Sequence, residues 1–316
     1  MPIPYFNRCF LLALLPMAAR AQQAPLTGVV TDATTAQPVP FAVVELLTQK
    51  AGVQADLQGR FSLELSAAPV ATDSLTVSAL GYSRRRVPVP GSGPVQLVLS
   101  AAPVALAEVQ VRPAPSTPVL LGATGSSHSL RFSSSGEAAR RGGHQIARFF
   151  PATAPGYFQS VGFYMDNGLV AALGPCDHKL RNTAPFRVRL YAADGPDGAP
   201  GTDLLNSTLL TAATRKTGWH TVDLRARNLR LPATGFYVAM EWVFTDAKYL
   251  CEYEVTNKAD KTKKTYIWYG QFLEGTEEQE PLAWSYTAGR GWHRFPVMRP
   301  GHGPENPMIQ ALVLPD

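Results

Sequence analysis

Several features that assign a chain to a functional class are absent from this sequence. The 316 residues contain no G-x-S-x-G or H-E-x-x-H motif, the patterns of a hydrolase nucleophile and of a zinc protease. Cysteine occurs three times, which leaves no paired Cys and His spacing for structural zinc. Charged residues make up 17% of the chain, and no basic stripe interleaved with aromatic residues predicts a nucleic-acid partner.

Long apolar runs are also absent beyond the N-terminus, so we expect no transmembrane segment after residues 1–21. These residues have the pattern of a secretory signal peptide, with Arg8 before an apolar run of about ten residues and Ala19-Arg20-Ala21 as the cleavage site. A bilayer-spanning helix needs about 20 apolar residues, so an uncleaved anchor is the less favoured alternative. Cleavage predicts an exported protein, located in the periplasm, on the outer membrane surface or outside the cell.

Removal of the signal peptide would also change the charge balance. Arg8 and Arg20 would leave with it, so that Lys and Arg fall from 29 to 27 against 24 Asp and Glu. The net charge of residues 22–316 would then be about +3, which is too weak to indicate a nucleic-acid partner.

Residues 22–112 have the pattern of a small β domain. Apolar and polar residues alternate at 61–65, 75–79 and 95–99, and glycine and proline occur between these runs. Side chains on a strand alternate between the two faces of a sheet, so each run buries one face. Several short strands separated by turn signals predict a β-sandwich.

Five motifs occur within this stretch in a fixed order. They are Gly28-Val29-Val30-Thr31-Asp32, Pro40-Phe41-Ala42-Val43-Val44, Asp56-Leu57-Gln58-Gly59-Arg60-Phe61, Leu80-Gly81-Tyr82 and Leu106-Ala107-Glu108-Val109-Gln110-Val111. Together they resemble the carboxypeptidase-regulatory-like domain that is common in exported proteins of Bacteroidota. The resemblance implies a seven-stranded, transthyretin-like sandwich with a carbohydrate-binding-like fold. In that family the domain often precedes an outer-membrane receptor, but the remaining 200 or so residues are too few for a 22-stranded barrel.

A second β domain is expected at residues 136–316, after a linker rich in proline, glycine and serine at 113–135. The strongest alternation is at 236–244, where Trp242 lies with the apolar residues and Glu241 on the opposite face. We expect eight to ten strands in a jelly-roll-like antiparallel β-sandwich. This part resembles uncharacterised β domains of exported Bacteroidota proteins, and that resemblance implies no activity.

Two cysteines, Cys176 and Cys251, would remain after signal cleavage. An even number of cysteines in an exported chain predicts one disulfide. It would close a loop of about 75 residues and stabilise the fold by on the order of 4 kcal/mol in the chain-entropy model. The alternative is a pair of buried free thiols.

Residues 194–203 form the loop with the strongest resemblance to a metal site. Asp194, Asp197 and Asp203 offer three carboxylates within ten residues, and calcium prefers oxygen ligands. The spacing does not match an EF-hand, and the Asp-Gly and Pro-Gly pairs are also common in turns. We therefore expect no cofactor and an ordinary turn at this loop, with calcium, bound by these aspartates, as the alternative.

Aromatic residues are concentrated in the second domain. Tyr266 and Trp268 are two residues apart and share one strand face, whereas Trp284 and Trp292 are expected in loops. Flat rings with a polar edge suit stacking on sugars. These four residues are the predicted ligand-binding residues, and ordinary packing between sheets is the alternative.

The sequence therefore favours a non-catalytic, exported binding or adhesion protein of the cell envelope, with a glycan or an outer-membrane protein as its partner. One alternative is an envelope hydrolase whose site lies in the rear domain. Glu241 is the single glutamate that we nominate for such a site, with no identifiable partner, and an exposed position on its strand is expected. The other alternative is a structural module of an outer-membrane assembly.

Overall fold

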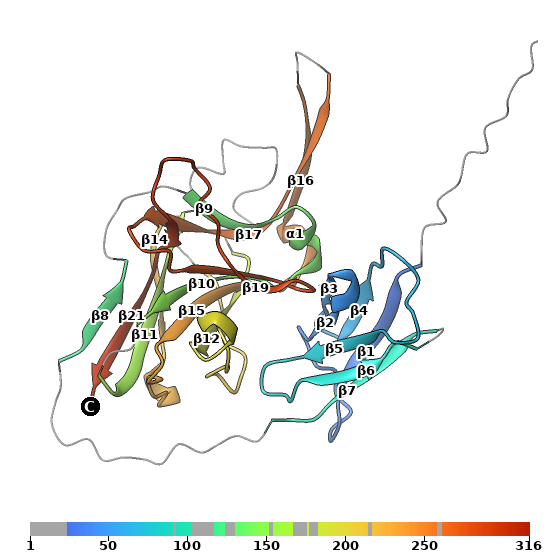
Figure 1. Ribbon diagram of the computed structural model, residues 1–316, viewed down its shortest axis with the longest axis horizontal. Coiled ribbons are helices and arrows are strands. Elements are labelled where there is room, and N and C mark those ends of the chain that lie inside the picture. Colours follow the sequence, from blue (N-terminus) through green and yellow to red (C-terminus); the bar gives the residue numbers. More distant parts are fainter. Residues whose placement is uncertain are drawn as a thin grey trace, which may run out of the picture.

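A computed structural model describes residues 24–90, 93–102, 117–123, 130–151, 154–166, 176, 183–213, 217–257 and 261–316. The predicted signal peptide lies outside these residues. The described chain is built almost wholly of β-strands, arranged as a front domain and a larger rear domain that lie side by side (Figure 1). Within the described residues, no helix has the length and apolar character needed to cross a membrane.

The front domain is a seven-stranded sandwich, as the sequence predicts. Its strands are β1 (Leu26–Asp32), β2 (Val43–Leu46), β3 (Ala51–Gln54), β4 (Arg60–Leu63), β5 (Ser74–Ser78), β6 (Arg85–Pro88) and β7 (Val95–Leu99). One sheet has the order β4-β1-β7 and the other β3-β2-β5-β6. The strands β1 and β7 pair in parallel, and the remaining pairs are antiparallel. Side chains that alternate along these strands, such as Leu63, Leu75 and Leu97, fill the space between the sheets.

Two glycines of the motifs have structural roles. A Cβ on Gly28 would lie 2.1 Å from the carbonyl oxygen of Val95, so only glycine lets β1 and β7 pair at this point. Gly59 has a φ of 70° in the turn before β4, where glycine is unstrained. The Asp56 carboxylate completes this turn by accepting hydrogen bonds from the backbone amides of Gln58 and Arg60, each at 2.8 Å. The motif at residues 56–61 therefore encodes a tight turn before β4.

The rear domain consists of two antiparallel sheets. The six-stranded sheet has the order β13-β12-β15-β10-β18-β19, and the eight-stranded sheet contains the path β16-β17-β11-β21-β8 with β14, β20 and β9 paired to it. The described strands are β8 (Val119–Gly122), β9 (Leu130–Ser135), β10 (His144–Phe150), β11 (Gly156–Asp166), β12 (Phe186–Ala192), β13 (Leu210–Thr211), β14 (Thr217–Asp223), β15 (Phe236–Trp242), β16 (Leu250–Thr256), β17 (Lys263–Glu277), β18 (Ala283–Thr287), β19 (Gly291–Arg294), β20 (Glu305–Pro307) and β21 (Ile309–Pro315).

A single apolar core joins the two rear sheets. It contains the inward residues of β15, including Val238, Met240 and Trp242, together with Phe163 of β11 and Ile309 of β21. Trp242 is buried, as its place in the alternating run predicts. The rear domain is thus an antiparallel β-sandwich. One short helix, α1 (Glu137–Arg141), lies at its edge beside β17 and β3.

Two strands lie within residues 113–135, the segment for which the sequence predicts a linker. β8 pairs with β21, and β9 pairs with β17. Phe132 of β9 is buried in the rear core, where its ring lies 4.9 Å from that of Phe295. These apolar runs are short and lie between glycine and serine clusters, so the composition of the segment conceals them. The described residues of this segment therefore belong largely to the rear sandwich.

Candidate functional site

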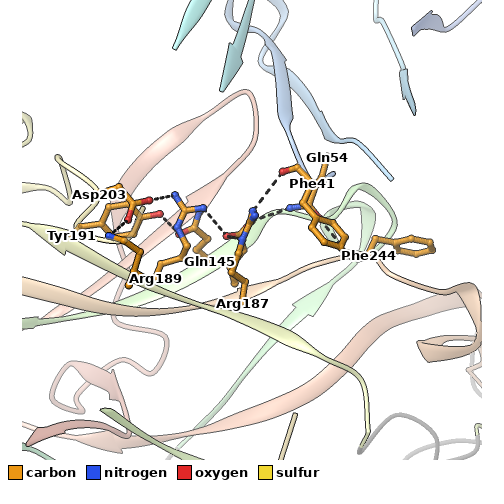
Figure 2. Close-up of polar contacts among 10 residues, drawn as sticks. Phe41, Gln54, Gln145, Arg187, Arg189, Tyr191, Asp203 and Phe244 are labelled. Atoms are coloured by element: carbon orange, nitrogen blue, oxygen red, sulfur yellow. Dashed lines mark hydrogen bonds and ion pairs between the residues drawn. The ribbon is translucent and has the colours of Figure 1, made fainter. Parts of the chain in front are cut away.

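A buried group of charged residues lies where the front domain covers the six-stranded sheet. Glu241 of β15 is completely buried and accepts hydrogen bonds from Arg187 at 2.8 and 2.5 Å and from Arg189 at 3.1 Å. Arg189 also pairs with Asp203 at 2.6 Å, and Tyr191 donates to Gln145 at 2.8 Å (Figure 2). Alternation places these β12 and β15 residues on the face that points away from the rear core.

The front domain completes this group. The Gln54 amide of β3 donates to Glu241 at 2.9 Å, and its oxygen accepts from the backbone amide of Phe244 at 3.2 Å (Figure 2). The guanidinium of Arg187 lies 5.7 Å from the ring centre of Phe41. Side chains of both domains therefore surround one carboxylate, which fixes how the domains pack.

A second buried glutamate, Glu45 of β2, belongs to the front domain and is contacted by groups of the rear domain. It accepts hydrogen bonds from the Tyr286 hydroxyl at 2.8 Å and from the backbone amide of Gly289 at 2.9 Å, both in the rear domain. Nearby, Gly52 of β3 meets the turn after β18 so closely that a Cβ would lie 2.4 Å from the carbonyl carbon of Ala288. The two domains thus touch through backbone as well as side chains.

The position of Glu241 corrects the expectation of an exposed carboxylate. Burial alone would raise the pKa of Glu241, but the adjacent guanidinium groups of Arg187 and Arg189 outweigh burial and lower it. Glu241 is therefore ionised and enclosed, which does not suit a general acid. The strand pattern identifies the face on which Glu241 lies, but it carries no information about the domain that covers that face.

The structure does not bring the three predicted calcium ligands together. The Asp194 carboxylate accepts from the backbone amide and the hydroxyl of Thr202, each at 2.7 Å, whereas Asp203 pairs with Arg189. Asp197 lies in the single turn η3 (Pro196–Gly198) with a φ of 55°. Within the described residues, no group of three His, Cys, Asp or Glu side chains is arranged to hold a metal ion. The loop is a turn closed by its own aspartate, which corrects the expectation of calcium ligands here.

Trp284 and Trp292 belong to a packed aromatic cluster beside the domain interface. Trp284 lies on β18 and is only 6% exposed, with its ring 6.4 Å from that of Tyr237. Trp292 of β19 is half-buried and packs against Tyr191 and Tyr286, at 5.5 and 5.4 Å. These residues lie on strands, not in the predicted loops. Their rings are occupied by protein contacts, so they do not join Tyr266 and Trp268 in one site.

Tyr266 and Trp268 do lie together, on the hairpin formed by β16 and the first half of β17. Their ring centres are 5.7 Å apart, and Tyr253 of β16 stacks against Tyr266 at 5.5 Å with an interplanar angle of 19°. Tyr253 is paired directly with Tyr266 across the hairpin, so all three rings share one face. We call these three residues the aromatic strip. The three side chains are half-buried, and the hairpin extends beyond the rest of the eight-stranded sheet (Figure 1).

Sequence reasoning missed Tyr253. The available signal was the alternation of Cys251, Tyr253 and Val255, which indicates a strand with these three residues on one face. Glutamates at 252 and 254 masked this pattern, because they gave the run the composition of a loop. The register between the two strands, which decides that Tyr253 meets Tyr266, cannot be read from either strand alone.

The predicted disulfide between Cys176 and Cys251 is confirmed. Cys251 lies opposite Trp268 in the hairpin register, so the disulfide joins the hairpin on the face that carries the aromatic strip. It links two residues that are 75 positions apart. The base of the hairpin is therefore held covalently to another part of the chain.

A second carboxylate group lies on the eight-stranded sheet. Arg131 of β9 pairs with Asp166 of β11 at 2.5 Å and with Glu274 of β17 at 3.6 Å. Glu274 is 1% exposed at its side chain. Burial, which exceeds the opposing effect of Arg131, together with the neighbouring Asp166 carboxylate raises the pKa of Glu274 to about 7. Glu274 therefore carries a proton under mildly acidic conditions.

Comparison with known proteins identifies the front domain. Residues 26–111 match the family model described as the CarboxypepD_reg-like domain, which confirms the resemblance noted in the sequence. No curated protein matches the chain. One similar solved structure is described as "Structural basis for the promiscuous specificity of the carbohydrate-binding modules from the beta-sandwich super family". It shares 10% identity, and the match covers 80% of this chain and 99% of that one with a TM-score of 0.19. At this TM-score the likeness carries no argument.

Proposed function

We propose that this chain is a non-catalytic, exported binding protein of the cell envelope that binds glycan through the aromatic strip. The observation that carries the proposal is the arrangement of Tyr253, Tyr266 and Trp268 on one face of the projecting hairpin. Each ring combines apolar area with a polar edge, which matches the faces and hydroxyl groups of a sugar. Three neighbouring rings provide contacts for successive units of an extended saccharide.

The surrounding structure reduces the entropic cost of binding a ligand at the aromatic strip. The β16–β17 pairing fixes both backbones, and the disulfide at Cys251 ties the hairpin down. Tyrosine and tryptophan have few rotatable bonds, so little side-chain freedom is lost when a ligand binds. The disulfide also supports the proposal of export, because disulfides persist mainly in oxidising compartments.

A glycan-array screen of residues 22–316, with and without calcium, is the direct test. Trp268→Ala and Tyr253→Ala are expected to weaken a selective hit about tenfold each, since the loss of one stacked ring removes on the order of 1 kcal/mol or more. Trp219→Ala is the matched control, because Trp219 is a half-buried tryptophan on β14 that packs against Tyr164. Its removal should leave the affinity unchanged.

A folded protein that binds no glycan on the array would contradict the proposal. The structural alternative would then gain support, and protein partners in the outer membrane would be sought. Binding that requires calcium would indicate that a metal ion takes part in glycan binding, although the carboxylates at 194–203 do not converge. A hit that survives Trp268→Ala and Tyr253→Ala would place the glycan site elsewhere on the chain.

A further inference from the structure

A pocket lies at the junction of the two domains, separate from the aromatic strip. It has a volume of about 250 Å³ and is lined from three directions. The front domain contributes Lys50 and Gly52, α1 contributes Glu137 and Arg141, and the turn between β18 and β19 contributes Arg290. Three cationic side chains and one carboxylate thus surround a space about the size of a single small ligand.

The cations of this pocket differ from several arginines elsewhere in the chain. Arg131, Arg148, Arg187 and Arg230, for example, each pair with a carboxylate. Within the described part of the chain, no ion pair involves Lys50, Arg141 or Arg290, and Glu137 is the one carboxylate in the lining. Three cations and one carboxylate leave the lining with an excess of positive charge, which favours an anionic ligand.

The backbone fixes where two of these residues lie. Lys50 has a φ of 49° and a ψ of 33°, a left-handed conformation in which glycine or asparagine is the usual residue. Directly after Lys50, the β3 backbone contacts the β18–β19 turn, where a Cβ on Gly289 would lie 2.5 Å from the carbonyl carbon of Ala51. The same Cβ would lie 2.7 Å from the carbonyl carbon of Lys50, so the backbone of Lys50 lies close to Gly289, the neighbour of Arg290 in the rear domain.

We propose that the pocket binds the oxyanion group of a small anionic ligand, no larger than one sugar unit, and that the bound anion bridges the front and rear domains. Lysine and arginine donate charge-assisted hydrogen bonds to carboxylate, sulfate and phosphate oxygens. A uronic acid unit and an inorganic oxyanion share this chemistry. The cations come from three separate segments, so the site exists only when the two domains are packed together.

This site is independent of the proposed glycan surface. Arg140 of α1 pairs with Glu252 of β16, which marks the side of the hairpin that faces α1. Tyr253 follows Glu252 directly, and neighbouring residues of a strand point to opposite faces. The aromatic strip and the anion pocket therefore lie on opposite sides of the hairpin. Loss of anion binding and loss of glycan binding can thus be observed independently.

Calorimetric titration of residues 22–316 at constant ionic strength tests the proposal, with sodium glucuronate, sodium sulfate, sodium phosphate and neutral glucose as ligands. We expect at least one anion to bind and glucose not to bind. The triple variant Lys50→Gln, Arg141→Gln and Arg290→Gln should weaken the anion at least tenfold. Arg86→Gln is the control, because Arg86 is an exposed cation on β6, at the opposite edge of the sheet from β3.

The pattern of binding distinguishes the sources of the anion. Tighter binding of glucuronate than of sulfate or phosphate identifies an acidic sugar, whereas the reverse order identifies an inorganic oxyanion, and both outcomes support the site. Trp268→Ala should leave the anion affinity unchanged. The proposal is overturned if no anion binds to the folded protein, if glucose binds equally well, or if the triple variant and Arg86→Gln lose affinity to the same extent.

Discussion

At the scale of single residues, two buried glutamates show how the surroundings decide the state of a carboxyl group. Glu241 lies between Arg187 and Arg189 and is ionised, whereas burial and the neighbouring Asp166 favour the protonated form of Glu274. Both residues lie on strands, and neither state can be derived from the sequence. The difference arises from the number of cations that reach each carboxyl group, which depends on contacts between distant strands.

Glu241→Gln is expected to lower the free energy of unfolding by about 3 kcal/mol. The change leaves Arg187 and Arg189 buried without their shared carboxylate, and a broken buried pair is costly. Urea unfolding followed by tryptophan fluorescence measures the loss. The comparison is Glu252→Gln, which removes one partner of the exposed pair with Arg140 and should cost less than about 1 kcal/mol. Equal losses in the two variants would show that Glu241 is not held by the arginines.

Glu274 predicts a dependence of stability on pH. Its folded pKa of about 7 lies above the ordinary value of 4.5, so the folded state holds the proton more tightly. The stabilisation is complete below about pH 4.5 and is lost as the pH rises through 7, with a total of about 3 kcal/mol at most. The free energy of unfolding should therefore fall more between pH 5 and pH 8 in the wild type than in Glu274→Gln.

The difference between wild type and variant isolates this effect. Burial lowers the pKa of His144 to about 4, so its contribution changes in the opposite direction, rising with pH between about 4 and 6.5 in both proteins. Glu64→Gln serves as a second comparison, because Glu64 is exposed on the front domain. Identical pH profiles for the wild type and Glu274→Gln would contradict the assignment.

At the scale of the elements, alternation within a strand could be predicted from the sequence, and pairing between strands could not. Five ordered motifs predicted the front domain, and the alternation of apolar and polar residues predicted the buried face of β15. The strands β8 and β9 were missed, because short apolar runs among glycine and serine resemble a linker. Trp284 and Trp292 were expected in loops but lie on paired strands, because the register of β18 and β19 depends on distant partners.

The hairpin of β16 and β17 provides a prediction at this scale. Cys251→Ser opens a loop of 75 residues and is expected to lower stability by up to about 4 kcal/mol in the chain-entropy model. It should also weaken any glycan that binds the aromatic strip, because Cys251 lies opposite Trp268. Thermal unfolding with and without reductant measures the first effect. Reductant should destabilise the wild type and leave Cys251→Ser unchanged, whereas a reductant effect on the variant would point to another cause.

At the scale of the whole molecule, the two domains form one unit through polar contacts. Gln54 and Glu45 of the front domain reach Glu241 and Tyr286 of the rear domain, and Val43 packs with Tyr286 and Trp292. Buried polar contacts require accurate geometry, so they favour one arrangement of the domains over others. The sequence predicted two domains, but it placed Glu241 at an exposed strand position and gave no sign of these contacts.

Gly52→Ala is expected to disturb this arrangement. The added methyl group would lie 2.4 Å from the carbonyl carbon of Ala288, so the domains must move apart and the network around Glu241 loses Gln54. We expect calorimetry to change from one unfolding transition to two, and small-angle scattering to give a larger radius. Gly93→Ala is the comparison for backbone strain alone: its φ of 83° disfavours alanine, but its methyl group meets no atom within 4 Å, so it should keep a single transition. A single unchanged transition in Gly52→Ala would show that the domains are not coupled here.

The parallel pairing of β1 with β7 has a consequence for how the chain is made. β1 lies between β4 and β7, and its partner residue Val95 follows Gly28 by about 70 positions. A chain that emerges N-terminus first therefore exposes one edge of β1 until nearly the whole front domain has followed. The first strand to appear is thus among the last to be completed. Folding of the three-stranded sheet therefore cannot finish before β7 has been made, because β7 supplies the second neighbour of β1.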